Sequence, residues 1–278
     1  MTNDTAPARE MQIRNTAVPR LGFGTWKING SECFTAVRDA LEIGYRHIDT
    51  ARAYGNEREV GAALAASRIE RSGVFLTTKI WMDDFEPARL RAAAEDSLRN
   101  LGTDYVDLLL LHWPNPAVAL ERSLETLVAL REEGLIGELG VSNFPPGLLR
   151  QAVASAPVFC DQVEFHPFLA QDELLEIAAA EDLMITAYAP LARGQVLSDP
   201  VLAKIAAEVG ASPSQVALRW LLEKPRVAVI PKAASRSNRL ANFAVFDIEL
   251  TDEHLAAIDA LPKDRRGFDP AWAPDWAD

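Results

Sequence analysis

Residues 74–112 read VFLTTKIWMDDFEPARLRAAAEDSLRNLGTDYVDLLLLH, and this stretch decides the fold class. Its two ends, Val74–Thr78 and Val106–Leu111, are short apolar runs of the kind that predict buried strands. Between them, Pro87–Asn100 has the length of a helix, and apolar side chains recur at helical spacing at Leu90, Ala94, Leu98 and Leu101. The order strand, helix, strand predicts a βαβ unit, in which the two strands run parallel.

The same alternation continues along the chain. Strands are expected at Leu21–Phe23, Tyr45–Ile48, Val74–Thr78, Val106–Leu111, Gly137–Val141, Phe159–Val163, Met184–Ala187 and Val227–Ile230. Helices are expected at Glu32–Ile43, Glu57–Ala66, Pro87–Asn100, Ala119–Glu133, Pro146–Ala154, Gln171–Glu181 and Pro213–Leu222. Asn56 and Glu59 are expected to form a capping box at the start of the second helix. Eight strands separated by helices predict an α/β fold, the (β/α)8 TIM barrel.

A doubly wound open sheet is the competing architecture. It needs a glycine-rich turn between a strand and a helix, and Gly22-Phe23-Gly24 lacks the third glycine. No linker divides the chain, so we expect one domain over residues 1–278, with residues 1–10 as a flexible N-terminal tail. Gln12–Arg14 and Val18–Arg20 are expected to form a β-hairpin that closes the bottom of the barrel.

Composition limits the compartment and the partners. The formal net charge of −12 argues against nucleic acid, which is bound mainly through lysine and arginine. Uninterrupted apolar runs such as Leu108–Leu111 are too short to span a membrane, and Met1–Glu10 lacks the pattern of a secretory signal. Cys33 and Cys160 lie far apart among apolar neighbours, which fits a reducing compartment. We therefore expect a cytoplasmic protein that binds a small molecule, and neither nucleic acid nor a membrane.

Polar side chains follow several of the expected strands. Asp49, Lys79 and His112 come at the ends of the second, third and fourth strands, and Gln162 and Glu164 come at the end of the sixth. In (β/α)8 barrels the active site gathers at the C-terminal ends of the strands. These side chains are therefore predicted to converge on one pocket.

Each of these residues also has an ordinary structural explanation. Asp49 could cap a turn, Lys79 could reach into solvent, and His112 could be a buried histidine satisfied by the backbone. Tyr54 could pack over the start of a helix. A shared site is favoured because three of the residues occupy equivalent positions on successive strands.

Several motifs in order along the chain resemble the aldo-keto reductase family. The first is Gly44-Tyr45-Arg46-His47-Ile48-Asp49-Thr50-Ala51, followed by Tyr54-Gly55-Asn56-Glu57. The others are Thr78-Lys79-Ile80-Trp81, Leu111-His112-Trp113-Pro114, Gly140-Val141-Ser142-Asn143-Phe144, Gln162-Val163-Glu164-Phe165-His166-Pro167, Tyr188-Ala189-Pro190-Leu191 and Ile230-Pro231-Lys232. With the closing Ala273-Pro274-Asp275-Trp276, the pattern is most similar to the bacterial branch of 2,5-diketo-D-gluconate and methylglyoxal reductases. The resemblance runs from about Val18 to the C-terminus.

The resemblance implies an NAD(P)H-dependent reductase of small aldehydes and ketones. Tyr54 would donate the proton to the carbonyl oxygen, and the cofactor would supply the hydride. Lys79 would lower the pKa of Tyr54, and Asp49 would hold the lysine charged and in place. His112 would bind and orient the carbonyl oxygen.

The resemblance also implies a binding site for the cofactor. Ser142, Asn143 and Gln162 would hold the nicotinamide carboxamide, and Tyr188 would stack on the ring. The remaining implied contacts are with Gly24, Thr25, Trp26 and Asp49 near the nicotinamide ribose, and with Leu191, Arg193 and Gly194 along the pyrophosphate.

The adenosine end of that site favours NADPH and leaves NADH possible. Lys232 and Arg236 are the cations expected to meet a 2′-phosphate. The chain departs from the common family pattern at Asn238, where an arginine is usual, and at Ala241, where a glutamate is frequent. Asn242 is retained and is expected to contact the cofactor.

Aromatic residues are expected to wall a fairly open substrate pocket that accepts small polar carbonyls. The residues expected to contact the substrate are Trp26, Tyr54, Trp81, His112 and Trp113, and either Trp272 or Trp276 could close the pocket from the C-terminal tail. No metal is expected, because the four histidines lack metal-ligand spacing. The family resemblance implies a monomer.

Two other functions stay open at this point. The chain could bind a cofactor on the same fold without catalysis, as a redox sensor or docking protein. It could also be an unrelated barrel lyase or hydrolase, although no Gly-x-Ser-x-Gly turn is present.

Overall fold

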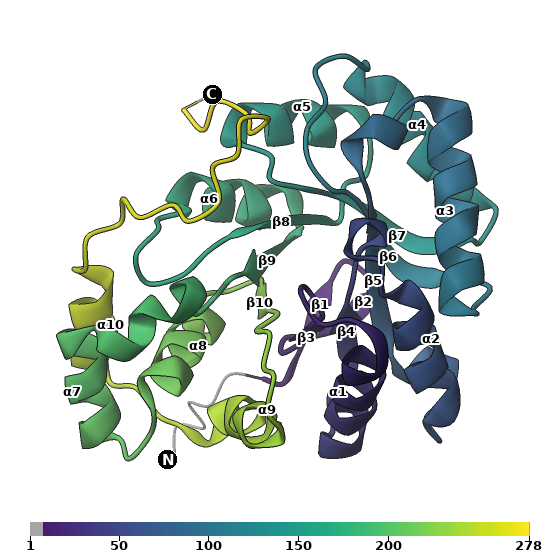
Figure 1. The fold of residues 1–278 in the computed structure, drawn as a ribbon. Helices are drawn as coiled ribbons and strands as arrows, with labels where there is room; N and C mark the ends of the chain where they lie inside the picture. The colour runs from purple at the N-terminus through teal and green to yellow at the C-terminus, as the bar shows by residue number, and fades with distance from the viewer. Residues whose placement is uncertain (1–7, 278) are drawn as a thin grey trace.

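The structure is a computed structural model that describes residues 8–277, and its centre is one eight-stranded parallel sheet. The strands follow one another around the sheet in chain order (Figure 1). They are β3 (Phe23–Gly24), β4 (His47–Asp49), β5 (Phe75–Ile80), β6 (Val106–Leu111), β7 (Ile136–Ser142), β8 (Cys160–Glu164), β9 (Met184–Tyr188) and β10 (Val227–Val229). The two ends of the sheet meet, because Gly22 N–H donates to Val229 O at 2.8 Å and Val229 N–H donates to Arg20 O at 2.8 Å. The predicted (β/α)8 barrel is confirmed.

Helices surround the sheet, and three of them were not expected from the sequence. The seven expected helices are α1 (Gly30–Ile43), α2 (Glu57–Ala66), α3 (Pro87–Leu101), α4 (Leu120–Glu132), α5 (Pro146–Ser155), α6 (Asp172–Glu181) and α8 (Pro213–Glu223). The additional helices are α7 (Pro200–Glu208), α9 (Arg236–Phe243) and α10 (Asp252–Asp259). Each additional helix starts at a side chain that caps its backbone, namely Asp199, Ser235 and Thr251. These cap residues are the sequence features from which the three additional helices could have been predicted.

An N-terminal hairpin closes the bottom of the barrel, as expected. It consists of β1 (Glu10–Ile13) and β2 (Thr16–Pro19), so both strands begin earlier than predicted. Ile13 and Val18 are fully buried against the strand starts in a second apolar cluster, apart from the core under the helices. The expected flexible tail falls mainly on residues 1–7, outside the described residues. Glu10 already belongs to β1, so the tail does not extend to that residue.

The predicted capping box of α2 is wrong. The Asn56 side chain makes no capping bond, although Asn56 stands at the N-cap position. Its amide instead donates to Thr25 O at 3.0 Å and to Ile28 O at 2.8 Å, and its oxygen accepts from Thr50 Oγ1 at 2.7 Å. The buried amide therefore ties the loop after β3 to the loop after β4, two of the loops that border the upper end of the barrel.

The contact between α2 and α3 requires a glycine. A Cβ built on Gly61 would lie 2.2 Å from the carbonyl oxygen of Leu101, at the end of α3. Such a distance can be relieved only by moving one helix relative to the other, because the obstacle is backbone.

We predict that Gly61→Ala lowers the free energy of unfolding by about 1–3 kcal/mol, the usual cost of overpacking. Alanine is a better helix former than glycine by about 1 kcal/mol, so at an open helical position the same substitution would raise the free energy of unfolding. The measurement is urea unfolding followed by circular dichroism. Gly73→Ala is the control, because its Cβ would meet only the movable Ile69 side chain, at 3.1 Å. A Gly61→Ala variant as stable as the wild type would contradict the packing argument.

Candidate active site

A large cavity opens at the C-terminal ends of the barrel strands. Its volume is about 1350 Å³. Pockets for one small molecule usually measure roughly 300–1,000 Å³, so this cavity has room for more than one ligand. Of the residues expected at the site, the cavity is lined by Gly24, Trp26, Asp49, Tyr54, Trp81, His112, Trp113, Ser142, Asn143, Gln162, Tyr188, Leu191, Arg193, Gly194 and Lys232. Lys79, Thr25, Arg236 and Asn242 do not line it.

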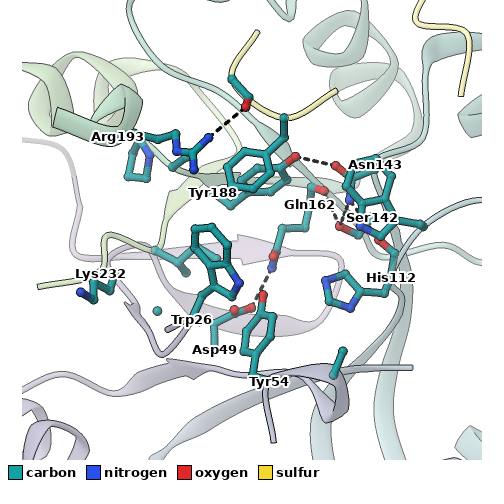
Figure 2. Close-up of a pocket in the computed structure, with 18 of the residues that line it drawn as sticks. Trp26, Asp49, Tyr54, His112, Ser142, Asn143, Gln162, Tyr188, Arg193 and Lys232 are labelled. Atoms are coloured by element: carbon teal, nitrogen blue, oxygen red, sulfur yellow. Dashed lines mark hydrogen bonds between the residues drawn. The ribbon is translucent and has the colours of Figure 1, made fainter. Parts of the chain in front are cut away.

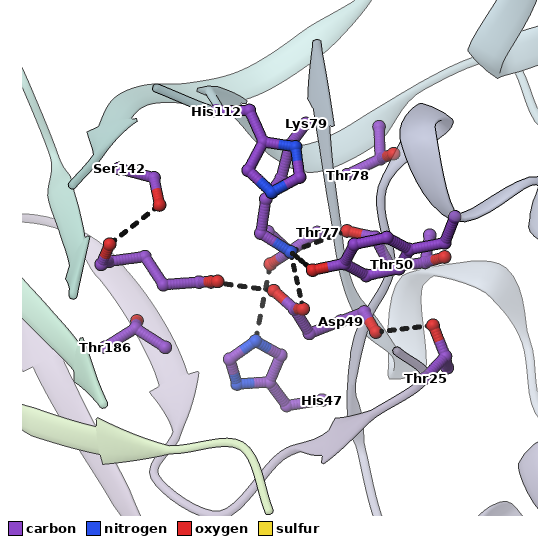
Figure 3. A network of polar contacts seen from close by, with 12 residues as sticks. Thr25, His47, Asp49, Thr50, Thr77, Thr78, Lys79, His112, Ser142 and Thr186 are labelled. Carbon is purple, nitrogen blue, oxygen red and sulfur yellow. Dashed lines mark hydrogen bonds and ion pairs between the residues drawn. The ribbon is translucent and has the colours of Figure 1, made fainter. Parts of the chain in front are cut away.

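Lys79 and Asp49 form a buried ion pair at the floor of this cavity (Figure 3). The Lys79 Nζ donates to Asp49 Oδ1 at 2.6 Å, to the carbonyl oxygen of Thr50 at 2.7 Å, and toward Tyr54 Oη at 3.4 Å. An ammonium group has three N–H donors, and each has an acceptor here. Burial lowers the pKa of Lys79, while the charge of Asp49 opposes that shift. Asp49 Oδ2 accepts from Gln162 Nε2 at 2.7 Å, which fixes the carboxylate from across the barrel.

Tyr54 enters the cavity from a short 3-10 turn, Arg52–Tyr54, that follows β4. Burial raises the pKa of the Tyr54 phenol well above its ordinary value, and the negative charge of Asp49 adds to the shift. The role expected for Lys79, to ease proton release from this phenol, stays a prediction. The phenol remains protonated at neutral pH, with the Lys79 ammonium directed at its oxygen.

His112 faces Tyr54 across the cavity (Figure 2). The two ring centroids are 5.7 Å apart, and the rings meet edge to face. Burial lowers the pKa of His112 well below its ordinary value, and the Lys79 charge lowers it further, so the imidazole is neutral at pH 7. Its Nδ1 has no hydrogen-bond partner within residues 8–277. A neutral, partly unsatisfied imidazole beside a protonated phenol can bind a polar oxygen.

An amide and hydroxyl cluster joins the ends of β7, β8 and β9. Ser142 Oγ donates to Gln162 O at 2.7 Å, and Asn143 Nδ2 donates to His112 O at 3.0 Å. Tyr188 Oη donates to Asn143 Oδ1 at 2.6 Å. Asn143 has φ of 63°, a left-handed conformation that asparagine tolerates better than most residues. The cluster therefore presents a rigid polar wall beside the ring of Tyr188 (Figure 2).

Aromatic side chains also line the cavity, and one of them was not expected. Trp81 contacts Trp272 with ring centroids 6.0 Å apart, and Trp113 contacts Trp276 at 6.1 Å. Trp272 lines the cavity, so the C-terminal tail contributes to the site. Phe268 also lines it but gave no signal in the sequence, because its place depends on a tail folded back over the barrel.

The expected cation cluster for a phosphate is only partly present at the cavity. Lys232 lines the cavity, but Arg236 forms ion pairs with Asp39 and Glu42 on α1. Asn242 is buried. Arg239, the residue after Asn238, donates to Asp39 at 2.6 Å and therefore has a structural role. Arg236 therefore does not line the cavity, and its contact with a 2′-phosphate stays a prediction.

Arg193 and Thr25 also make hydrogen bonds within the protein. The guanidinium of Arg193 lines the cavity and donates to Gly267 O at 3.2 Å. Thr25 is buried, and its hydroxyl donates to Asp49 O at 3.0 Å. Thr25 thus supports the backbone of Asp49 from beneath the cavity.

Comparison with known proteins identifies the family of this site. A sequence model of the Aldo/keto reductase family matches residues 20–263. The chain belongs to the aldo/keto reductase family. Methylglyoxal reductase DkgB of Salmonella typhimurium is 37% identical over 265 residues, which cover 92% of this chain and 99% of the relative.

Solved structures agree with this membership of the aldo/keto reductases. A structure provisionally named 2,5-diketo-D-gluconic acid reductase B superimposes with a TM-score of 0.95 and 39% identity, and the match covers 98% of each chain. The aldose reductase of Schistosoma japonicum superimposes with a TM-score of 0.87 and 33% identity over 94% of each chain. The chain is therefore an oxidoreductase, in a family that uses nicotinamide cofactors. Within residues 8–277, no helix is long and apolar enough to cross a membrane.

We predict that Asp49→Asn lowers the free energy of unfolding by about 3–5 kcal/mol, because it leaves the Lys79 ammonium buried without a counter-charge. The double variant Asp49→Asn with Lys79→Met should recover most of that loss, since no uncompensated charge remains. Denaturant titration of the wild type, both single variants and the double variant gives the coupling energy. Equal stabilities for the Asp49→Asn single and double variants would contradict this account of the pair.

Proposed function

We propose that the protein is an NADPH-dependent reductase of small aldehydes and ketones that also accepts NADH. Candidate substrates are methylglyoxal and 2,5-diketo-D-gluconate, which the names of its relatives suggest. The observation that carries the proposal is the grouping of Tyr54, Lys79, Asp49 and His112 at the floor of a cavity large enough for a cofactor and a small carbonyl together.

Tyr54 is the proton donor in this proposal. A bound nicotinamide would supply a hydride to the carbonyl carbon, which makes the carbonyl oxygen strongly basic. The raised pKa of Tyr54 keeps its proton in place until that charge develops. The Lys79 N–H directed at the phenol oxygen then stabilises the phenolate that is left, and Asp49 keeps Lys79 charged.

His112 orients the carbonyl in this proposal. Because its imidazole is neutral, it can donate one N–H to the carbonyl oxygen without adding a second cation next to Lys79. Its lowered pKa also keeps it in that form throughout the neutral range. The substrate oxygen would lie between His112 and Tyr54, whose rings already face one another.

The residues around the cavity fit a nicotinamide cofactor. Ser142, Asn143 and Gln162 offer amide and hydroxyl groups suited to a carboxamide, and Tyr188 beside them offers an aromatic face. Gly24, Trp26 and Asp49 would lie beside the ribose. Leu191, Arg193 and Gly194 would lie along the pyrophosphate.

The choice between NADPH and NADH is proposed to depend on Lys232. It is the one lysine among the described residues that line the cavity, whereas Arg236 is occupied by Asp39 and Glu42. With Arg193 assigned to the pyrophosphate, one cation for the 2′-phosphate supports a preference for NADPH that still leaves NADH usable. Asn242 and Arg236 could contribute only after rearrangement.

We predict that Lys232→Met raises the Kd of NADPH about tenfold or more, since a hydrogen bond to a charged group contributes about 1.5–3 kcal/mol. The Kd of NADH, which lacks the 2′-phosphate, should change much less. Quenching of tryptophan fluorescence measures both constants without turnover. Equal weakening of the two cofactors would show that Lys232 does not meet the 2′-phosphate.

We predict that the wild type oxidises NADPH in the presence of methylglyoxal and that Tyr54→Phe lowers kcat by about 10²–10⁴-fold, the usual contribution of a general acid. The Kd of NADPH should be nearly unchanged, because phenylalanine keeps the ring. Cofactor absorbance at steady state measures the rate over a panel of small aldehydes, keto acids and diketo sugars. A variant that keeps most of its rate would refute the assignment of Tyr54. Tight NADPH binding without turnover by the wild type would instead indicate a binding protein.

A further inference from the structure

The C-terminal tail reaches the cavity by a fixed route over the end of β8 (Figure 1, yellow). Arg265 N–H donates to Phe168 O at 2.9 Å, and Asp264 pairs with Leu169 as an antiparallel bridge. Beyond this point Gly267, Phe268 and Trp272 line the cavity. The backbone at Gly267 and Phe268 is therefore where the tail turns from the barrel surface into the site.

One buried carboxylate holds that turn. Glu164, the last residue of β8, accepts from Gly267 N–H at 2.9 and 3.0 Å through its two oxygens, and from Phe268 N–H at 2.9 Å. It also lies 3.1 Å from His166 Nε2. His166 Nδ1 accepts from the backbone N–H of Phe168, so Nε2 carries the hydrogen that points at Glu164. Burial alone would raise the pKa of Glu164, but these hydrogen bonds together hold it below its ordinary value.

Gly267 packs closely against the carboxylate group of Glu164. A Cβ on this residue would lie 2.8 Å from Glu164 Oε1. The absence of a side chain lets the backbone N–H approach the carboxylate directly, so glycine and glutamate act as one anchoring unit.

The anchored turn places a single aromatic ring in the cavity wall. Phe268 has its ring centroid 5.2 Å from that of Trp26 and 5.5 Å from that of Tyr188. The guanidinium of Arg193 lies 4.8 Å from the same ring centroid. Phe268 thus lies against Tyr188 and Trp26, two residues that belong to the proposed cofactor and substrate site.

We propose that Glu164 is a positioning residue that fixes the Gly267–Phe268 backbone, so that Phe268 completes the wall in which the carbonyl substrate is bound. This inference rests on the proposed reductase function. Glu164 acts through Phe268 and touches neither the carbonyl nor the proton donor. Because Phe268 also contacts Tyr188 and Arg193 of the proposed cofactor site, loss of the anchor weakens the binding of both the carbonyl substrate and the cofactor.

The test is Glu164→Gln, whose amide NH2 would face the backbone N–H groups in place of one acceptor oxygen. With methylglyoxal as substrate, KM is expected to rise about tenfold, corresponding to one hydrogen bond to a charged group, with the Kd of NADPH also raised and kcat changed less than threefold. Trypsin should cut faster after Arg265 and Arg266, which adjoin the released turn. The matched control is Asp161→Asn, which removes a buried carboxylate from the same strand. Its carboxyl group lies near the backbone N–H of Phe144 rather than any described residue of the tail, so KM and cleavage of the tail should stay as in the wild type.

A double-variant cycle with Phe268→Ala tests whether Glu164 acts on catalysis through Phe268. If Glu164 acts through Phe268, the changes in kcat/KM for the two single variants will not add in the double variant. Additive effects would overturn the proposal, as would a Glu164→Gln enzyme with unchanged KM and unchanged cleavage of the tail. A variant cut faster at all tryptic sites, with a lowered Tm, would show a purely structural role and would also overturn it. If the wild type reduces no carbonyl, the proposed function fails, and the tryptic cleavage still tests the anchor.

Discussion

The Lys79–Asp49 ion pair is the interaction on which the upper end of the barrel depends. A buried ammonium group is costly unless all of its protons are accepted, because water is absent to solvate it. Its acceptors come from the end of β4 and the turn that carries Tyr54, while Gln162 fixes Asp49 from β8. Lys79 and Asp49 come from neighbouring strands, whereas Gln162 is 113 residues from Asp49 and reaches it from across the barrel. The site is therefore as rigid as the barrel itself.

The barrel interior is apolar at the bottom and becomes polar toward the top, and this arrangement stabilises the Lys79–Asp49 ion pair. At the bottom, Ile13 and Val18 of the hairpin fill the opening with apolar side chains. Just below the ion pair, His47 lies 3.3 Å from Thr77 Oγ1 and 3.2 Å from the carbonyl oxygen of Pro19. Burial lowers the pKa of His47, so it is neutral and adds no charge beneath Lys79. The dry lower barrel keeps water from the ammonium group, and the neutral polar layer satisfies the backbone without competing for Asp49.

The sequence predicted what depends on local pattern and strand order. Asp49, Lys79 and His112 were placed together because equivalent positions on successive parallel strands share one edge. In the structure Asp49 and His112 line one cavity, and Lys79 is buried against Asp49 at its floor. Sequence did not predict contacts that depend on where distant segments lie. Asn56 looked like a helix cap by local rules, but its amide is used by two neighbouring loops. The role of Phe268 was invisible because it requires Glu164, more than a hundred residues earlier, to hold the tail.

At the proposed adenosine end of the site, helix packing determines the positions of the charged side chains as much as ligand binding would. Asp39 on α1 accepts from buried Arg239, which also donates to the carbonyl oxygens of Ala233 and Ala234 at 2.9 Å. Arg236, one turn earlier on α9, shares the same carboxylate and reaches Glu42. Two arginines and two acids thus join α1 to α9, and the cationic character of this helix is largely neutralised there. A 2′-phosphate arriving at this end would compete with Asp39 and Glu42 for Arg236 but would meet Lys232 without such a competitor at the cavity wall. If the proposed cofactor site is correct, substitutions on α1, which lies outside the cavity lining, are expected to alter cofactor preference by changing which cation is available.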